Sequence, residues 1–342
     1  MYSNLWAILI AVAAASNVSI AQDAPKKSAD APSKKAQNAQ SMQLPPTLAD
    51  KVIFERDVVY GDAGHRPLKL DILRPKKPKS KKIPAVAFVH GGGWAGGDKA
   101  YGVIPMAMLA MDGEYLGVTI SYRFSQEAKW PAQIHDCKAA IRWLRANAEK
   151  YGIDPDKIGC WGGSAGGHLV AMLATTADCK ELEGDCGSKE CSSRVSCAVN
   201  YFGPADLTRY GVKSKYPEGG KASQLLEALL GGPVDDKPKE AASASPINFV
   251  TKDDAPILFV HGDQDGLVPL SHSEILKAEC DKNNVPAKLI VVKGGGHGFR
   301  NPEVFKRVKA YFDQQLYGAK VEVSSEPIQE IAPPANRKAK SN

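Results

Sequence analysis

A serine in a glycine-rich turn is the residue whose type and setting most clearly suggest chemistry. Ser164 is the centre of the pentapeptide G-G-S-A-G at residues 162–166. It follows a β-prone run at 157–161 and precedes a helical stretch at 165–175, the context in which a G-x-S-x-G serine is a nucleophile. Glycines permit the sharp turn, and the helix amino end adds positive potential near a developing oxyanion. We predict a nucleophile; the alternative is a glycine-rich turn that binds phosphate.

A second glycine-rich segment, H-G-G-G-W at residues 90–94, follows the apolar run 84–89. Successive glycines expose backbone N–H groups, and such donors stabilise the oxyanion that forms during acyl transfer. An HGGG-type segment accompanies the nucleophile turn in one large class of hydrolases. The predicted oxyanion donors are the N–H groups of Gly92, Gly93 and Ala165.

A nucleophilic serine needs a histidine base and a carboxylate that fixes the tautomer of that histidine. In this architecture the chain order is serine, acid, histidine. Asp265 follows the strand-like run 256–260, and we predict that it is the acid. Asp263 is the nearby competitor, expected to brace the turn through backbone N–H bonds. His297, in G-G-G-H-G-F, is the predicted base.

The other histidines receive supporting roles. His261 abuts the acid loop and His272 lies in a predicted helix, so both are weaker candidates for the base. His90 is expected to orient the glycine loop, and His168 to pack or form hydrogen bonds. Three more residues are placed near the mouth of the site, where they contact substrate or stabilise loops: Trp94, Asp98 and Asp206.

Short apolar runs alternate with helical patterns along the chain. The alternation predicts an α/β fold with a mainly parallel central sheet and helices on both faces. In such sheets chemistry gathers at the carboxyl ends of the strands, and the candidate residues follow predicted strands. The predicted strands are 51–60 and 68–73 (a hairpin), 84–89, 115–121, 157–161, 196–201, 256–260 and 287–292. The predicted helices are 131–151, 165–175, 268–282 and 302–316.

Length and composition fit one enzyme-sized folded unit with flanking segments. The 342 residues are 43% hydrophobic and 24% charged, a globular composition. A net charge of +6 with no basic stripe in the folded region argues against nucleic-acid binding. We predict four segments: a signal peptide at 1–21, a disordered linker at 22–50, one domain at 51–318 and a disordered tail at 319–342.

The prediction of a signal peptide rests on the apolar run 5–15, which is too short to span a bilayer, followed by Ser19-Ile20-Ala21. The expected location is secreted or periplasmic, without a stable membrane anchor. In such a compartment the four cysteines that lie between the end of the predicted helix 165–175 and residue 197 are expected to form disulfides. The favoured pairs are Cys179–Cys197 and Cys186–Cys191, with Cys137, Cys160 and Cys280 free and packed.

Taken together, the motifs resemble serine esterases of the α/β-hydrolase fold, and are similar to the branch of bifunctional acetyl/feruloyl esterases and secreted carboxylesterases. The resemblance covers roughly residues 51–318. Its motifs are H-G-G-G-W-A-G-G-D-K, Y-R, W-P, G-G-S-A-G-G-H-L, F-G-P, H-G-D-Q-D and G-H-G-F. By this resemblance the triad falls on Ser164, Asp265 and His297, and the oxyanion donors on Gly92, Gly93 and Ala165.

The chain departs from the hormone-sensitive-lipase branch in two respects. That branch usually has Asp before the serine, where this chain has Gly163, and it carries a helical N-terminal cap that residues 22–50 are too polar to build. The segment 203–250, with a helical patch at Ser223–Leu230, is the expected small lid. The resemblance suggests that the resulting open cleft suits acyl groups on polysaccharides better than long lipid chains.

The resemblance implies a carboxylic ester hydrolase that works through an acyl-enzyme, with no metal or organic cofactor. The expected substrates are short acyl or feruloyl esters, either small molecules or esters on plant-type or algal polysaccharides. One alternative is a serine peptidase of the prolyl-oligopeptidase kind, against which the absent N-terminal propeller and the loop at 90–94 argue. The other is a catalytically silent binding protein on the same fold.

Overall fold

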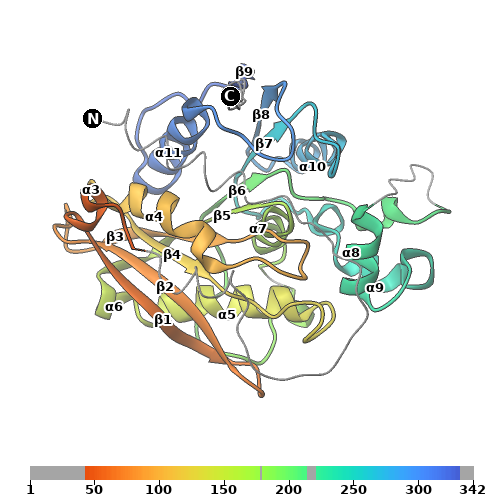
Figure 1. Ribbon diagram of the computed structural model, residues 1–342, viewed down its shortest axis with the longest axis horizontal. Helices are drawn as coiled ribbons and strands as arrows, with labels where there is room; N and C mark the ends of the chain where they lie inside the picture. The colour runs from red at the N-terminus through yellow and green to blue at the C-terminus, as the bar shows by residue number, and fades with distance from the viewer. Residues whose placement is uncertain (1–42, 178, 214–220, 332–342) are drawn as a thin grey trace, which may run out of the picture.

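The computed structural model describes residues 43–177, 179–213 and 221–331 (Figure 1). The predicted signal peptide and most of the predicted linker lie outside the described residues. Within the described part of the chain, no helix is both long and apolar enough to cross a membrane.

A single sheet of nine strands organises the described residues, in the order β1-β2-β4-β3-β5-β6-β7-β8-β9. β1 and β2 form the predicted antiparallel hairpin, β2 also pairs antiparallel with β4, and every other pairing is parallel. The predicted strands are confirmed. Their bounds are β1 Val52–Asp62, β2 Pro67–Pro75, β3 Ile83–Val89, β4 Leu116–Ile120, β5 Ile153–Gly163, β6 Cys197–Tyr201, β7 Ile257–Gly262, β8 Ala287–Lys293 and β9 Ile328–Gln329.

Helices cover both faces of this sheet, as predicted (Figure 1). One core packs under α3, α4 and α11, and a second core packs under α5, α7 and α10. The α-helices are α3 Pro46–Ala49, α4 Val103–Ala110, α5 Ala132–Ala146, α6 Ala148–Tyr151, α7 Ala165–Thr175, α8 Lys221–Leu230, α9 Pro238–Ser243, α10 Ser271–Lys282 and α11 Pro302–Tyr317. Short 3₁₀ turns include η2 Lys99–Gly102, η4 Leu207–Tyr210 and η6 Pro246–Phe249.

The predicted helices are present, with two differences. The helix predicted over 131–151 is divided at Asn147 into α5 and α6. The helix α4 was not predicted, and all eight of its residues are buried against the sheet. A helix is recognised in a sequence because apolar residues on one face alternate with polar residues on the other. Since α4 is buried on all sides and has no polar face, its sequence lacks this pattern.

Both predicted domain boundaries need correction. Leu48 of α3 is fully buried, so the fold begins before residue 51. Residues 319–331, predicted as part of a disordered tail, are ordered in the structure. Their strand β9 pairs in parallel with β8, and Val323 and Ile328 are buried in the core beneath α11.

The predicted disulfides are wrong, because all seven cysteines are free in the structure. Cys197 is buried on the face of β6 that packs under α11, whereas Cys179 packs against the core on the opposite face. The sheet therefore separates the members of that pair. Cys186 Sγ lies 3.1 Å from the backbone N of Asp62, beside β1. The prediction of free, buried thiols at Cys137, Cys160 and Cys280 is confirmed.

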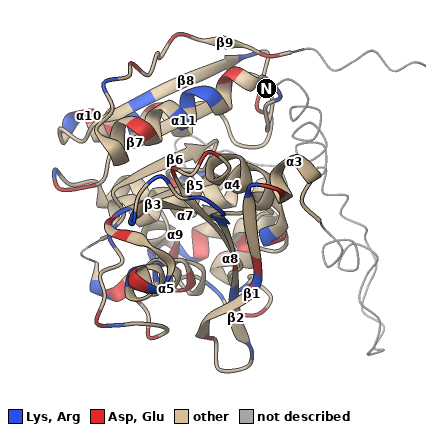
Figure 2. Ribbon diagram, turned by 90° about the vertical axis from the view of Figure 1, so that its left-hand side faces the viewer, with Lys and Arg blue, Asp and Glu red and all other residues tan. Residues whose placement is uncertain are grey.

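Charged residues are spread over the molecule. Figure 2 shows both basic and acidic residues along several of the helices visible in that view. Many are paired at the surface, as in the contact of Lys309 with Glu114 and Asp313.

The contribution of the C-terminal segment to stability can be measured by truncation. Ending the chain at Gly318 removes β9 with the buried side chains of Val323 and Ile328. Burying one such side chain contributes about 1.5–3 kcal/mol, so we expect the loss of two to lower the free energy of unfolding by roughly 3–6 kcal/mol in a urea titration. A matched chain ending at Ile331 should keep full stability. Equal stability of the two truncated chains would show that β9 contributes nothing.

Candidate active site

Ser164 lies in a sharp turn between the central strand β5 and the helix α7, as predicted. Its φ of 57° and ψ of −123° lie in a region that non-glycine residues seldom adopt. Two backbone hydrogen bonds hold the turn: Ser164 donates to Tyr201 O at 2.9 Å, and Ser164 O accepts from His168 N at 2.9 Å. The residue is therefore fixed in a strained conformation by β6 on one side and α7 on the other.

The glycines around Ser164 allow backbones to cross at very short range. A Cβ atom on Gly166 would lie 2.0 Å from Val89 O, and one on Gly162 would lie 2.4 Å from Gly166 O. Any larger residue at either position would push α7 away from β3 and β5. Glycine is required here so that the first turn of α7 sits directly beneath the serine.

The H-G-G-G-W loop follows β3 and packs against the nucleophile turn. A Cβ on Gly91 would lie 2.8 Å from Gly163 O and 3.3 Å from the Cβ of Ser164. Gly92 has a φ of 121°, and a Cβ there would lie 2.2 Å from Gly96 O. No hydrogen bond between described residues uses the N–H groups of Gly92 or Gly93. The N–H groups of Gly92 and Gly93 thus belong to a loop that packs against the serine turn and are not used by other described residues.

His90 stabilises the glycine loop from beneath, as predicted. Its ring stacks on Tyr122 with centroids 4.5 Å apart, and its Nδ1 lies 2.7 Å from Gly91 O. The Tyr122 hydroxyl donates to His90 O at 3.0 Å. Burial lowers the pKa of His90 to about 4, so the ring is neutral near pH 7 and Nδ1–H donates to Gly91 O.

The predicted acid and base meet at the carboxyl ends of β7 and β8. His297 Nδ1 lies 2.7 Å from Asp265 Oδ2. The other carboxylate oxygen accepts hydrogen bonds from the backbone N–H groups of Leu267 at 2.9 Å and Val268 at 3.0 Å. The Asp265 side chain is fully buried. A carboxylate fixed in this way orients the imidazole so that its Nε2 is free for chemistry.

Electrostatics keep Asp265 ionised. Burial by itself would raise the pKa of this carboxyl group, but hydrogen bonds from His261 and His297, the charge of His297 and backbone donors outweigh that effect. The pKa of Asp265 is consequently held well below its usual range. The carboxylate is thus charged at every pH at which a histidine base works.

The working nitrogen of His297 is not used elsewhere in the described structure. His297 Nε2 is buried and has no hydrogen-bond partner among the described residues. Phe202 packs on this ring, with centroids 4.4 Å apart, and its edge lies 3.4 Å from the position of a Cβ on Gly163. Phe202 therefore spans the distance between the nucleophile turn and the base. Sequence reasoning gave it no role, although its F-G-P motif was noted.

The competing residues have structural partners. Asp263 accepts from Gly294 N at 2.7 Å and so braces the turn, as predicted. His261 Nδ1 lies 2.7 Å from Ser273 Oγ and its Nε2 lies 2.9 Å from Val268 O. His272 accepts from Ala205 N at 3.1 Å. Asp98 and Asp206 cap the 3₁₀ turns η2 and η4.

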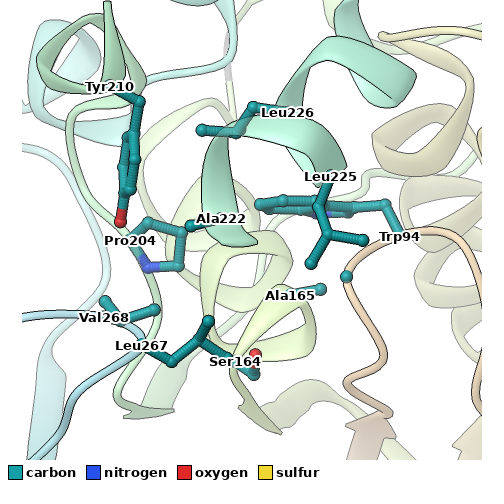
Figure 3. Close-up of a pocket in the computed structure, with 11 residues that line it drawn as sticks. Trp94, Ser164, Ala165, Pro204, Tyr210, Ala222, Leu225, Leu226, Leu267 and Val268 are labelled. Atoms are coloured by element: carbon teal, nitrogen blue, oxygen red, sulfur yellow. The ribbon is translucent and has the colours of Figure 1, made fainter. Parts of the chain in front are cut away.

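An apolar pocket opens beside Ser164 (Figure 3). It has about 340 Å³ of empty space, part of it open to solvent. Leu225 points from α8 toward Ala165, and a Cβ on Gly93 would lie 2.6 Å from its Cδ1. The predicted helical patch of the lid is thus α8. The sequence predicted an open cleft, but in the structure Leu225 of α8 lies against the glycine loop and narrows the space beside the serine. The lining residues are Gly93, Trp94, Ser164, Ala165, Pro204, Tyr210, Ala222, Leu225, Leu226, Leu267 and Val268.

Most of the apolar lining was missed in the sequence. Leu267 and Val268 come two and three residues after the acid, and Pro204 ends the F-G-P motif, so their nearness to these motifs was the available signal. Leu225 and Leu226 belong to a helix whose position over the serine is set only by tertiary packing. Trp94 was expected at the mouth, and it does line the pocket.

The fold and this arrangement of serine, glycine loop and Asp–His pair are similar to those of serine esterases of the α/β-hydrolase class, as the resemblance implied. The chain belongs to the BD-FAE family, whose model matches residues 70–280.

Known relatives are esterases. The chain is 32% identical over 255 residues to Esterase LipC of Mycobacterium tuberculosis. This match covers 73% of this chain but only 60% of LipC. A truncated carbohydrate esterase from gut microbiota has a similar structure, with a TM-score of 0.70 and 34% identity, covering 78% of this chain and 97% of that one. Esterase Est2 of Thermogutta terrifontis matches at a TM-score of 0.64 and 25% identity, and the match covers 84% of this chain and 100% of Est2.

The charge of Asp265 should make a measurable contribution to stability. Because the pKa of Asp265 is lowered in the folded state, the stabilisation is present above the unfolded pKa of about 3.9 and is lost as the pH falls below it. We expect Asp265→Asn to be less stable than the wild type at pH 7, with a smaller difference at pH 3. Urea unfolding at the two pH values measures this.

A control for this experiment is Asp50→Asn, which removes an exposed carboxylate at the end of α3. It should give nearly the same free energy of unfolding as the wild type at both pH values. A stability difference for Asp265→Asn that is constant between pH 7 and pH 3 would contradict the low pKa of the acid.

Proposed function

We propose that the protein is a carboxylic ester hydrolase that works through an acyl-enzyme on Ser164. The observation that carries the proposal is the 2.7 Å hydrogen bond between His297 Nδ1 and Asp265 Oδ2, at the same edge of the sheet as the strained serine turn. A serine, a histidine with a free Nε2 and a buried carboxylate are the groups that nucleophilic acyl transfer requires.

In the proposed reaction, His297 Nε2 takes the proton from Ser164 as its oxygen attacks the ester carbonyl. The carbonyl π electrons move to oxygen and form a tetrahedral oxyanion. When this collapses, the bond to the alcohol breaks, and the alcohol leaves with the proton from His297. Water, deprotonated by His297, then attacks the acyl-enzyme, and the acid is released as Ser164 regains its proton. Asp265 holds the imidazole and stabilises its cationic form throughout.

The oxyanion is proposed to accept hydrogen bonds from the N–H groups of Gly92, Gly93 and Ala165. The loop containing the first two contacts the serine turn, and the third residue is the first of α7. Donors fixed before the reaction cost no reorganisation when charge develops, and each contributes about 2.7–4 kcal/mol to the transition state. The amino end of α7 adds a favourable field at the same point.

The proposed substrates are short acyl or feruloyl esters, including esters on polysaccharides. Two supports are available: the limited apolar pocket beside the serine, and the similarity to a carbohydrate esterase from gut microbiota. Est2 of T. terrifontis has been solved with propionate and with butyrate bound. We also propose a secreted or periplasmic location, because residues 5–15 form an apolar segment typical of a signal peptide. Cell fractionation of the full chain tests this, and recovery of the protein only in the cytoplasmic fraction would contradict it.

The first test is covalent labelling. A fluorophosphonate reagent should label the wild type, and Ser164→Ala should abolish both labelling and the hydrolysis of p-nitrophenyl acetate. The expected loss of kcat is about 10⁴-fold or more, because the nucleophile and base act as one unit. Asp265→Asn should keep the fold and lose about 10³–10⁴-fold, because it stabilises the wrong tautomer.

A matched control is His65→Gln, since His65 is exposed and its ring lies 3.1 Å from Glu127 Oε2, outside the pocket lining. If the control folds and is labelled, loss of labelling in Ser164→Ala is specific. A wild type that is not labelled and hydrolyses no ester would favour a silent binding protein on this fold.

The pocket predicts a limit on acyl length. We expect the wild type to prefer acetate and butyrate esters to octanoate esters and long-chain triglycerides. Leu225→Ala should raise the ratio of kcat/KM for octanoate over acetate by about 10-fold or more, because opening space for one or two methylene groups is worth about 1–3 kcal/mol. Leu225→Met, which preserves side-chain volume, should retain the wild-type preference.

Acetylated xylan and feruloyl esters extend this comparison. Activity on either would support the proposed polysaccharide-linked substrates, while a strong preference of the wild type for long-chain triglycerides would contradict both the acyl limit and the proposed substrate class.

A further inference from the structure

His168 is a buried polar residue to which the proposed reaction assigns no part. It lies in the first turn of α7, four residues after the serine, and its backbone N–H donates to Ser164 O at 2.9 Å. Its side chain is fully buried. A buried imidazole must have partners for both ring nitrogens, and here the partners come from two different parts of the site.

The hydrogen bonds determine the tautomer of His168. Trp94 Nε1 lies 3.2 Å from His168 Nδ1, and an indole N–H can only donate, so Nδ1 is the acceptor. The proton is therefore on Nε2, which donates to Ala244 O at 2.6 Å. Burial lowers the pKa of His168 to about 4, so the ring is neutral near pH 7 and can keep this acceptor. Each nitrogen has one partner and neither is free.

Trp94 needs such a partner because its backbone is strained. It ends the glycine loop with a φ of 55°, next to Gly93 at 61°. A bulky residue in the left-handed region persists only where its surroundings fix it. The Trp94 ring stands edge-on to His168, with centroids 5.2 Å apart and planes at 88°, and Trp94 O accepts from Ser125 N at 2.8 Å. The side chain is thus held by His168 and the backbone by Ser125.

On its other side, His168 reaches the lid segment. Ala244 lies between α9 and η6, and Trp130 packs on His168 with centroids 5.6 Å apart. Trp130 in turn donates from its backbone N–H to Leu229 O at 2.9 Å and from its ring to Ser243 Oγ at 2.9 Å. His168 is the point at which α7, the glycine loop and the lid meet.

We propose that His168 is a positioning residue for the oxyanion hole: its Nδ1 lone pair fixes the Trp94 ring, and through it the backbone of Gly92 and Gly93, relative to Ser164. The inference rests on the proposed function, because it concerns the transition state of that reaction. Among the described residues no hydrogen bond joins the His168 ring to the Ser164 side chain, so its ring acts through Trp94. Its bond to Ala244 is a separate contribution that holds the lid.

Two substitutions separate the two hydrogen bonds. In His168→Asn, the amide oxygen can occupy the position of Nδ1 and accept from Trp94, but the side chain is too short to reach Ala244 O. In His168→Gln, the amide nitrogen can reach the position of Nε2 and donate to Ala244 O, while the acceptor for Trp94 is lost. Both side chains are neutral, polar amides, so the comparison isolates which bond affects the reaction.

We expect His168→Asn to keep kcat for p-nitrophenyl acetate within about 3-fold of the wild type. His168→Gln should lower kcat about 10–100-fold with KM nearly unchanged, which is less than the loss of a whole oxyanion donor, about 10²–10³-fold. Trp94→Phe removes the donor from the other side and should cause a similar loss of kcat. The double variant His168→Gln/Trp94→Phe should be no worse than either single variant, since both remove the same bond.

The outcomes are distinct. Equal kcat values for the Asn and Gln variants, or additive losses in the double variant, would overturn the proposal, and melting temperatures would then identify a purely structural role. If neither His168 variant folds, Trp94→Phe decides alone, and an unchanged kcat overturns the proposal. Failure of the proposed function is recognised separately, because the wild type would then be neither labelled by fluorophosphonate nor active.

Discussion

The site depends on one steric constraint, the close crossing of α7 with β3 and β5. A Cβ on Gly166 would lie 2.0 Å from Val89 O, so the helix can begin where it does only because that residue is glycine. The crossing leaves the chain no room for an ordinary turn, and Ser164 takes the strained conformation with a φ of 57°. It also brings the end of β3 to the serine, so that the loop leaving β3 must pass beside the nucleophile. The position of the candidate oxyanion donors thus follows from the packing of one helix turn.

The remaining groups are held by different kinds of interaction. Asp265 and His297 are joined by charge, and the buried carboxylate keeps its charge because hydrogen bonds and a cationic neighbour outweigh the effect of burial on its pKa. The glycine loop is held by neutral contacts, with His90 beneath it and His168 behind Trp94. Burial lowers the pKa of both of these rings to about 4, so they are uncharged near pH 7. The supports of the loop therefore carry no charge, in contrast to the buried carboxylate of Asp265.

The sequence was sufficient for features that local rules determine. Strands buried on both faces, the turn around Ser164 and the order of acid and base are all readable from short motifs, and the structure has them in the predicted places. Features that depend on tertiary contacts were not readable. α4 has no polar face, and β9 has two residues and exists only because β8 offers an edge. The cysteine pairs failed because proximity at one edge of a sheet does not reveal which face a side chain occupies, and Cys197 is on the face opposite Cys179.

The lid illustrates how these contributions combine. α8 belongs to a segment with no motif, yet Leu225 lies so close to Gly93 that a Cβ there would be 2.6 Å away. A wider glycine loop would be blocked by α8, and a side chain of larger volume at position 225 would press on the loop. A residue that lines the pocket beside the serine therefore also lies against the loop that would bind the oxyanion. Pocket shape and oxyanion geometry cannot vary independently in this chain, so a change of acyl group by substitution on α8 must also preserve the loop that His168 and Trp94 hold.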